Sequence, residues 1–170
     1  MQIYLIGFMG CGKSTVGKKL ANKLQYKFLD IDKMIQKGED TTIEKVFQNK
    51  GETYFRQLEN KYLRELPEKS GNYVIATGGG LPCHDGNIDY MNENGLTIYL
   101  KMNTGQLTYR LKHAKKKRPL LQNKTEEEVV KYIETKLKER EPFYNKANIL
   151  FDAFNLKISD LVEQINQYHK

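Results

Sequence analysis

The residues from Gly7 to Thr15 have the types and spacing of a site that binds nucleotide phosphates. They fit the pattern G-x-x-x-x-G-K-[ST], follow an apolar run at residues 3–6 and open a pattern typical of a helix. Glycines let backbone N–H groups converge on phosphate oxygens, and the positive end of the following helix adds to this attraction. In such a loop Lys13 reaches the β- and γ-phosphates and the Ser14 hydroxyl binds Mg²⁺. The sequence thus predicts a site for a nucleoside triphosphate in this P-loop (residues 7–15). Its predicted binding residues are Gly10, Cys11, Gly12, Lys13, Ser14 and Thr15.

Two carboxylates, Asp30 and Asp32, are separated by one residue at the end of a predicted strand. Because α/β sheets bind their ligands at the carboxyl ends of strands, both carboxylates would face a ligand there. One could help to hold Mg²⁺ while the other accepts the proton of a substrate hydroxyl. A pair of this kind can instead cap the following helix, and the sequence leaves both interpretations open.

Three glycines in a row, Gly78, Gly79 and Gly80, follow another predicted strand. Without side chains, this segment lets a small ligand lie directly against the backbone. Without the P-loop, these three glycines would be interpreted simply as a turn. Together with the P-loop it indicates that two ligands meet at one edge of the sheet.

Three arginines, Arg56, Arg118 and Arg140, also require an explanation. A guanidinium group is suited to forked binding of a carboxylate, which Arg56 and Arg140 could provide. Arg118 precedes a proline in the lysine-rich irregular stretch at about residues 113–124, which is a candidate for a mobile lid over the transferring phosphate. Taken singly, each arginine could equally be a partner in a surface salt bridge.

Strands alternate with helices along the whole chain, which predicts an α/β protein with a parallel sheet covered on both faces. The expected fold is the three-layer P-loop kinase fold with a five-stranded sheet, in a single domain over residues 1–170. The predicted strands are 2–6, 27–29, 73–76, 96–100 and 148–151. The predicted helices follow the P-loop and then cover the segments from the cap at Thr41 to about 48, 53–66, 86–92, 104–112, 125–140 and 158–165. Two of them begin with expected capping boxes, Thr41 with Glu44 and Thr125 with Glu128.

The composition is that of an ordinary soluble protein of 170 residues, with 28 Lys and Arg against 21 Asp and Glu. The positive excess gathers near residues 112–118 without interleaved aromatic side chains, which argues against a nucleic-acid partner. No apolar run approaches the roughly 20 residues that span a bilayer. The first strand leaves no room for a signal peptide, so we expect a cytoplasmic protein without a membrane partner. We expect a monomer because the pattern shows no obvious extra apolar face. Two cysteines without metal-ligand spacing support neither a zinc site nor a disulfide framework.

A small-metabolite kinase is the favoured class of P-loop protein. A GTPase would need the pattern D-x-x-G after its third strand, and none of the aspartates has a glycine three residues later. A kinase instead needs acidic groups after the P-loop helix, which Asp30 and Asp32 supply.

The ordered set of motifs resembles shikimate kinase over essentially the full length of the chain. The matching segments are Gly7-Phe8-Met9-Gly10-x-Gly12-Lys13-Ser14-Thr15, Asp30-x-Asp32, Phe55-Arg56-x-x-Glu59, Thr77-Gly78-Gly79-Gly80, Arg118-Pro119-Leu120-Leu121 and Arg140-x-Pro142-x-Tyr144. This resemblance implies transfer of the γ-phosphoryl group of ATP to the 3-hydroxyl of shikimate, with Mg²⁺ as cofactor. Gluconate kinase and adenylate kinase share the fold but lack this combination. A kinase of another hydroxy acid, such as gluconate, remains the alternative.

The resemblance also implies which residues contact the acceptor and carry out the transfer. Lys13 and Arg118 would neutralise the transferring phosphate, and Asp32 would be the candidate base. Arg56 and Arg140 would bind the shikimate carboxylate in a pocket completed by the backbone of Gly78, Gly79 and Gly80. The region that binds this substrate would extend over about residues 31–62.

For the nucleotide and its metal, the resemblance implies that Ser14 and Asp30 hold Mg²⁺ and that Arg110 stacks on adenine. Asn155 would belong to the adenine loop, which begins at Asp152. This loop departs from the family pattern because no proline follows it.

Overall fold

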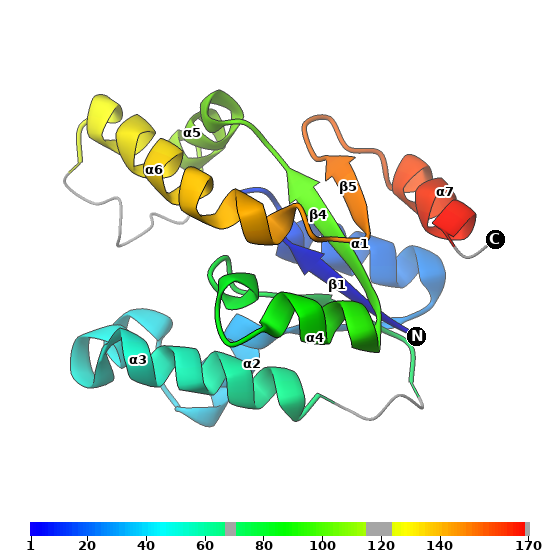
Figure 1. The fold of residues 1–170 in the computed structure, drawn as a ribbon, viewed down its shortest axis with the longest axis horizontal. Coiled ribbons are helices and arrows are strands. Elements are labelled where there is room, and N and C mark those ends of the chain that lie inside the picture. The colour runs from blue at the N-terminus through cyan, green and yellow to red at the C-terminus, as the bar shows by residue number, and fades with distance from the viewer. Residues whose placement is uncertain (67–70, 115–123, 169–170) are drawn as a thin grey trace.

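Five parallel strands form one sheet in the order β2-β3-β1-β4-β5, in a computed structural model that describes residues 1–66, 71–114 and 124–168. The strands are β1 (Gln2–Ile6), β2 (Lys27–Asp30), β3 (Tyr73–Ala76), β4 (Leu96–Lys101) and β5 (Ile149–Asp152). All residues of β1 and β3 are buried, as is typical of central strands covered by helices on both faces. The predicted fold class is confirmed (Figure 1).

Helices lie on both faces of this sheet (Figure 1). They are α1 (Lys13–Leu24), α2 (Ile31–Gly38), α3 (Ile43–Arg64), α4 (Asn87–Asn94), α5 (Thr104–Lys112), α6 (Glu126–Tyr144) and α7 (Ile158–Tyr168), with a short 3₁₀ turn, η1 (Leu81–Cys83). Helix α1 contacts β1, β2, β3 and α7, whereas α4 packs against β4 on the opposite face. Helices α3 and α6, which are distant in the sequence, both pack against η1.

The register of the strands brings three predicted site segments to one edge of the sheet. Ala76 at the end of β3 pairs with Asp30 on one side and with Leu5 on the other. Beyond this level β1 continues into the P-loop and β3 continues into the three glycines. The carboxyl edge of the sheet therefore collects the P-loop, the acidic pair and the glycines, as expected for a ligand site in a parallel sheet.

The segment after β2 differs from the prediction, because the helix α2 begins directly at Ile31. The cap of α3 is Thr42, whose hydroxyl accepts the N–H of Lys45, and not Thr41 as predicted. Thr41 instead donates its N–H to the carbonyl of Gln36 and so belongs to the turn that closes α2.

The remaining helices largely follow the prediction. Gly51 adopts a positive φ of 80° inside α3, so this element consists of two helical parts on either side of a kink, as predicted by a helix that ends at about 48 and another over 53–66. The capping box of Thr125 and Glu128 is confirmed, but α6 continues beyond residue 140 to Tyr144. Among the described residues, no helix is both long and apolar enough to cross a bilayer. Most of the predicted lid, residues 115–123 with Arg118, lies outside the described residues.

Candidate functional site

The P-loop turns back on itself around the side chain of Lys13. Its Nζ donates hydrogen bonds to the carbonyl oxygens of Gly7 at 2.7 Å and Phe8 at 3.0 Å. Gly12 precedes α1 with a positive φ of 101°, which a residue with a side chain rarely adopts. The loop thus holds the lysine charge beside the first N–H groups of α1, where an anion would be attracted from both sides.

The carboxylate of Asp30 serves two functions at the end of β2. Its Oδ1 accepts the N–H of Lys33 at 3.2 Å and so caps α2, which is the structural alternative left open by the sequence. Its Oδ2 accepts the hydroxyl hydrogen of Ser14 at 2.7 Å. A hydroxyl and a carboxylate oxygen side by side are the ligand types that Mg²⁺ takes together with substrate phosphates, so these residues fit that ion. The described residues contain no group of three or more His, Cys, Asp or Glu that could hold a metal by themselves.

Gly78 lies between two acidic side chains. A Cβ atom at this position would be 2.2 Å from Oε1 of Glu59 and 2.9 Å from Oδ1 of Asp32. The absence of a side chain at Gly78 therefore lets a helix α2 carboxylate and a helix α3 carboxylate approach the same short stretch of backbone. Glu59 is almost completely buried, with 1 % of its side chain exposed.

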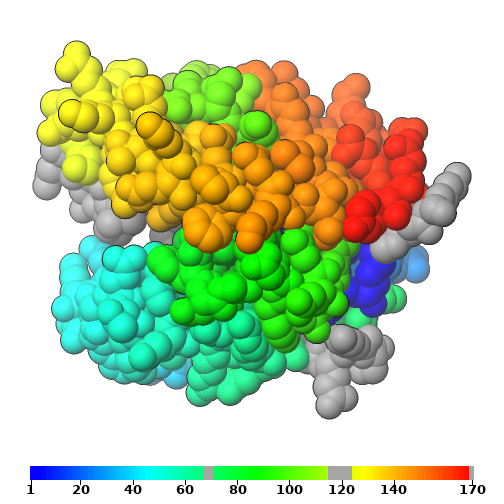
Figure 2. All heavy atoms as spheres, in the orientation of Figure 1, coloured from blue at the N-terminus to red at the C-terminus, as the bar shows by residue number. Residues whose placement is uncertain are grey.

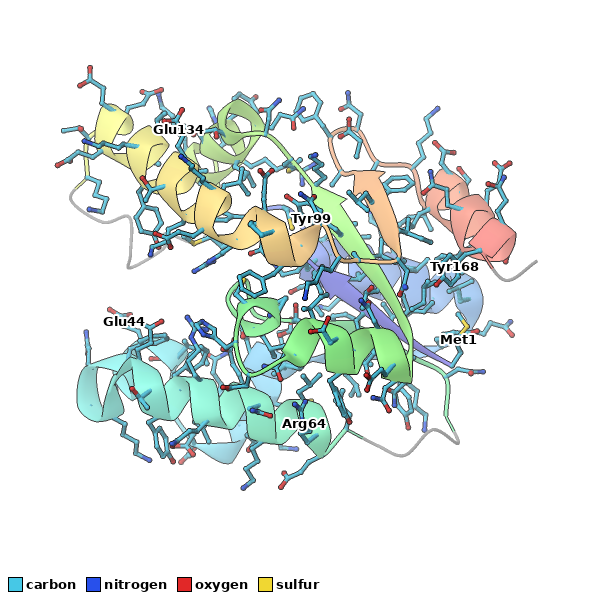
Figure 3. All side chains as sticks on the ribbon, in the orientation of Figure 1. Met1, Glu44, Arg64, Tyr99, Glu134 and Tyr168 are labelled. Atoms are coloured by element: carbon cyan, nitrogen blue, oxygen red, sulfur yellow. The ribbon has the colours of Figure 1, made fainter. Side chains whose placement is uncertain are left out.

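Gly79 is the point at which the P-loop and α6 meet. A Cβ atom there would be 3.3 Å from Nη1 of Arg140, 3.4 Å from the backbone N of Met9 and 3.5 Å from the carbonyl oxygen of Gly7. The hydroxyl of Tyr144 donates to the carbonyl of Gly79 and so fixes α6 to the glycines. The ring of Tyr144 packs on that of Tyr99 with centroids 5.0 Å apart, where β4 passes beneath α6 (Figure 3).

Gly80 lies against the second arginine, Arg56. A Cβ atom at this position would be 2.5 Å from Nη1 and 2.8 Å from Nη2 of Arg56, so the guanidinium group lies directly against the backbone. Arg56 comes from α3 and Arg140 from α6, and both reach the same three glycines. In Figure 2 a notch separates the atoms of α3 from those of α6, on the side where these helices approach η1.

The comparisons with known proteins identify the family of the chain as a whole. Residues 9–169 match the family model described as shikimate kinase. The chain belongs to the shikimate kinase family.

Individual relatives in this family resemble the chain over nearly its whole length. It is 42 % identical to a shikimate kinase of Azobacteroides pseudotrichonymphae genomovar. CFP2 over 96 % of both chains. The crystal structure of shikimate kinase from Bacteroides thetaiotaomicron has a TM-score of 0.91 and 37 % identity, covering 98 % of this chain and 97 % of that one. The shikimate kinase from Acinetobacter baumannii, in complex with shikimate, has a TM-score of 0.82 and 35 % identity, covering 98 % and 90 %.

Arg110 lies at the P-loop end of the candidate site. Its Nη1 donates to the carbonyl of Cys11 at 3.1 Å and its Nη2 donates to the carbonyl of Ala153 at 3.3 Å. The arginine thus joins the P-loop to the predicted adenine loop after β5. Asn155 follows in that loop, exposed and with a positive φ of 60°. Thr15 lies exposed in the first turn of α1.

The carboxyl group of Glu59, beside Gly78, has a perturbed pKa. Burial raises its pKa from 4.5 to about 7, although the guanidinium of Arg56 opposes this shift, and the negative charge of Asp32 raises it further. The ion pair of Glu59 with Arg56 has a length of 2.5 Å. This carboxyl group therefore takes up a proton at a higher pH than an exposed glutamate does.

Glu59 and Tyr144 lie within the recognised motifs, but the sequence predicts no role for either of them. A signal for Glu59 was present, because it lies four residues from both Phe55 and Leu63 on the buried stripe of α3. An acidic residue on such a stripe must have a partner, and here the partner is Arg56. No comparable signal existed for Tyr144, whose hydroxyl bonds to Gly79 across a long stretch of sequence.

Proposed function

We propose that the chain transfers the γ-phosphoryl group of ATP to the 3-hydroxyl of shikimate, giving shikimate 3-phosphate and ADP. The observation that carries this proposal is the meeting of three kinds of group at the glycines 78–80. A phosphate-binding loop lies on one side, the carboxylate of Asp32 on another, and the guanidinium groups of Arg56 and Arg140 reach in from two helices. An acceptor with one carboxylate and several hydroxyls matches this set of groups.

The transfer follows from these positions. The P-loop amides and Lys13 hold the β- and γ-phosphates, while Arg56 and Arg140 fix the acceptor through its carboxylate. The hydroxyl oxygen attacks the γ-phosphorus, Asp32 accepts the hydroxyl proton, and the bond between the γ-phosphorus and the bridging oxygen breaks to leave ADP. Phosphoryl transfer needs mainly such positioning and charge neutralisation.

Mg²⁺ completes the proposed site, with Ser14 and Asp30 as the protein groups that would hold it. When bound, the ion would neutralise negative charge on the β- and γ-phosphates. Because the Ser14 hydroxyl and Asp30 Oδ2 are 2.7 Å apart, both oxygens are already directed to one place. Asp30 also accepts the N–H of Lys33 through its other carboxylate oxygen and so caps α2.

The remaining assignments are extensions of the same proposal. Arg118 would neutralise charge on the transferring group, and Arg110 and Asn155 would border the adenine. The partners are then two small molecules, ATP and shikimate. The cytoplasmic location and monomeric state expected from the sequence stay predictions.

An enzyme-coupled assay of ADP release tests the proposed function. We expect ADP release in the presence of ATP and Mg²⁺ to depend on shikimate and to yield one shikimate 3-phosphate for each ADP. Gluconate serves as the alternative acceptor, because it also has one carboxylate and several hydroxyls. ADP release that shikimate does not stimulate above ATP alone would reject the proposal, and preferential turnover of gluconate would replace it with the alternative.

A further inference from the structure

The guanidinium group of Arg56 is bound by two glutamates from its own helix. Glu52 Oε1 accepts hydrogen bonds from Nη2 at 2.9 Å and from Nε at 3.3 Å. Glu59 Oε2 accepts from Nη1 at 2.5 Å. All three nitrogens of the arginine therefore have an acidic partner within α3, one turn before or after it.

The two glutamates differ sharply in how easily they could leave Arg56. The side chain of Glu59 is 1 % exposed, so separating it from the guanidinium would leave a buried charge without a partner. The side chain of Glu52 is 65 % exposed, so its carboxylate can turn into water at little cost. The nearby guanidinium lowers the pKa of Glu52, as expected for an ionised partner.

The edges of the guanidinium group also differ in access. Nη1 is paired with the buried carboxylate of Glu59, whereas Nε and Nη2 are paired with the exposed carboxylate of Glu52. A carboxylate binds arginine best through two parallel hydrogen bonds to one edge. The edge formed by Nε and Nη2 is the one that an incoming carboxylate can take, and Glu52 occupies it.

We propose that Glu52 and the substrate carboxylate compete for the Nε–Nη2 edge of Arg56, so that substrate binding exchanges one carboxylate for the other. This inference rests on the proposed function, since it assumes an acceptor that carries a carboxylate. Glu59 stays in place during the exchange and keeps the guanidinium group oriented toward the glycines. Glu52 thereby weakens the binding of the acceptor, whereas Glu59 holds the arginine side chain in position.

The sign of the expected effect separates competition from simple support of Arg56. If Glu52 competes, replacing it with glutamine frees the edge and lowers the KM for shikimate by about two- to fivefold, the range expected for an exposed ion pair, with kcat unchanged. Glu52→Asp retains the charge but withdraws the carboxylate, so its KM should fall as well. If Glu52 only supported Arg56, both variants would raise KM.

Kinetics on four proteins test this inference: the unaltered chain, Glu52→Gln, Glu52→Asp and the control Glu44→Gln. Glu44 lies exposed near the start of the same helix (Figure 3). Its replacement removes the same charge but does not remove a carboxylate that competes with the substrate for Arg56. We expect Glu44→Gln to leave KM unchanged. A shikimate analogue with a hydroxymethyl group in place of the carboxylate should have the same KM in all four proteins.

The outcomes distinguish this inference from the proposed function. No shikimate-dependent turnover by the unaltered chain would reject the proposed function and the inference with it. Normal turnover with a KM that Glu52→Gln leaves unchanged or raises would overturn the inference alone. An equal fall in KM for Glu44→Gln would also overturn it, because general electrostatics would then explain the effect.

Discussion

Replacing Glu59 with glutamine tests whether its buried carboxyl group ionises only near neutral pH. The side chain is 1 % exposed, and burial raises its pKa from 4.5 to about 7 against the opposing charge of Arg56. Glutamine has nearly the same shape and retains an oxygen that can accept from Arg56. The substitution therefore removes the ionisation with little change in packing.

The magnitude follows from the pKa difference between the folded and unfolded chains. In the unfolded chain Glu59 ionises near 4.5, and in the folded protein near 7, so between these values the folded protein binds the extra proton. The stabilising contribution is fully present below about pH 4.5 and is lost as pH rises through about 7. At about 1.4 kcal/mol for each unit of pKa, the loss in the free energy of unfolding is about 3 kcal/mol.

Urea unfolding of both proteins at about pH 4.5 and about pH 8 measures this effect. Ionisable groups other than Glu59 are common to both chains, so their contributions cancel in the difference. We expect Glu59→Gln to gain about 3 kcal/mol relative to the unaltered chain between these two values of pH. Glu65→Gln, at the exposed end of α3, controls for the loss of one carboxylate. Parallel pH curves for the Glu59→Gln variant and the unaltered chain would refute the reasoning.

Three further predictions concern the proposed reaction. Arg56→Lys should raise the KM for shikimate by about 10- to 100-fold, because an ammonium group cannot form the forked contact with a carboxylate. Arg118→Ala should lower kcat by roughly 100-fold or more while it changes the KM for shikimate much less, because its proposed role lies in the transition state. Ser14→Ala should raise the Mg²⁺ concentration required for half-maximal activity by about tenfold, because one of two protein oxygens at the ion is lost. Steady-state kinetics with varied shikimate or varied Mg²⁺ measures all three.

Each of these predictions has an outcome that contradicts it. An unaltered KM in Arg56→Lys would remove this arginine from the acceptor pocket. A large rise in KM with normal kcat in Arg118→Ala would make that residue a binding group. An unchanged Mg²⁺ requirement in Ser14→Ala would place the ion away from the pair formed by Ser14 and Asp30. Lys18→Ala, on the exposed side of α1, is a suitable control for all three.

The positions of the strands and of the P-loop could be predicted because local signals determine them. Continuous apolar runs define β1 and β3, and the glycines and lysine of the P-loop follow a fixed spacing. The parallel arrangement follows from the alternation of strands and helices. Together these signals also place Asp30 and the glycines 78–80 at one edge of the sheet.

Competition between neighbouring residues limited the prediction of element boundaries. Thr41 and Thr42 both have the side chain of a helix cap, and Thr42 becomes the cap because Thr41 already bonds to Gln36 in the preceding turn. Helix α2 is not predicted, because the side chains of Asp30 and Asp32 suit a metal or base site at the end of a strand as well as the start of a helix. Asp30 in fact both caps α2 and faces Ser14.

Side-chain contacts between distant segments could not be derived from local patterns. The motifs predicted that Arg56 and Arg140 act together, but only the packing of α3 and α6 on η1 brings both to the glycines. The two acidic partners of Arg56 depend on the rotamer of one long side chain. The raised pKa of Glu59 depends in turn on how completely the surrounding helices exclude water.

A crystal structure of the protein with ADP and shikimate bound together tests the central claim most directly. The account predicts that the shikimate carboxylate lies between the guanidinium groups of Arg56 and Arg140 beside Gly79. It also predicts that the 3-hydroxyl lies within hydrogen-bond distance of Asp32 and faces the phosphates of ADP in the P-loop. A carboxylate bound away from both arginines, or a 3-hydroxyl directed away from the P-loop, would contradict it.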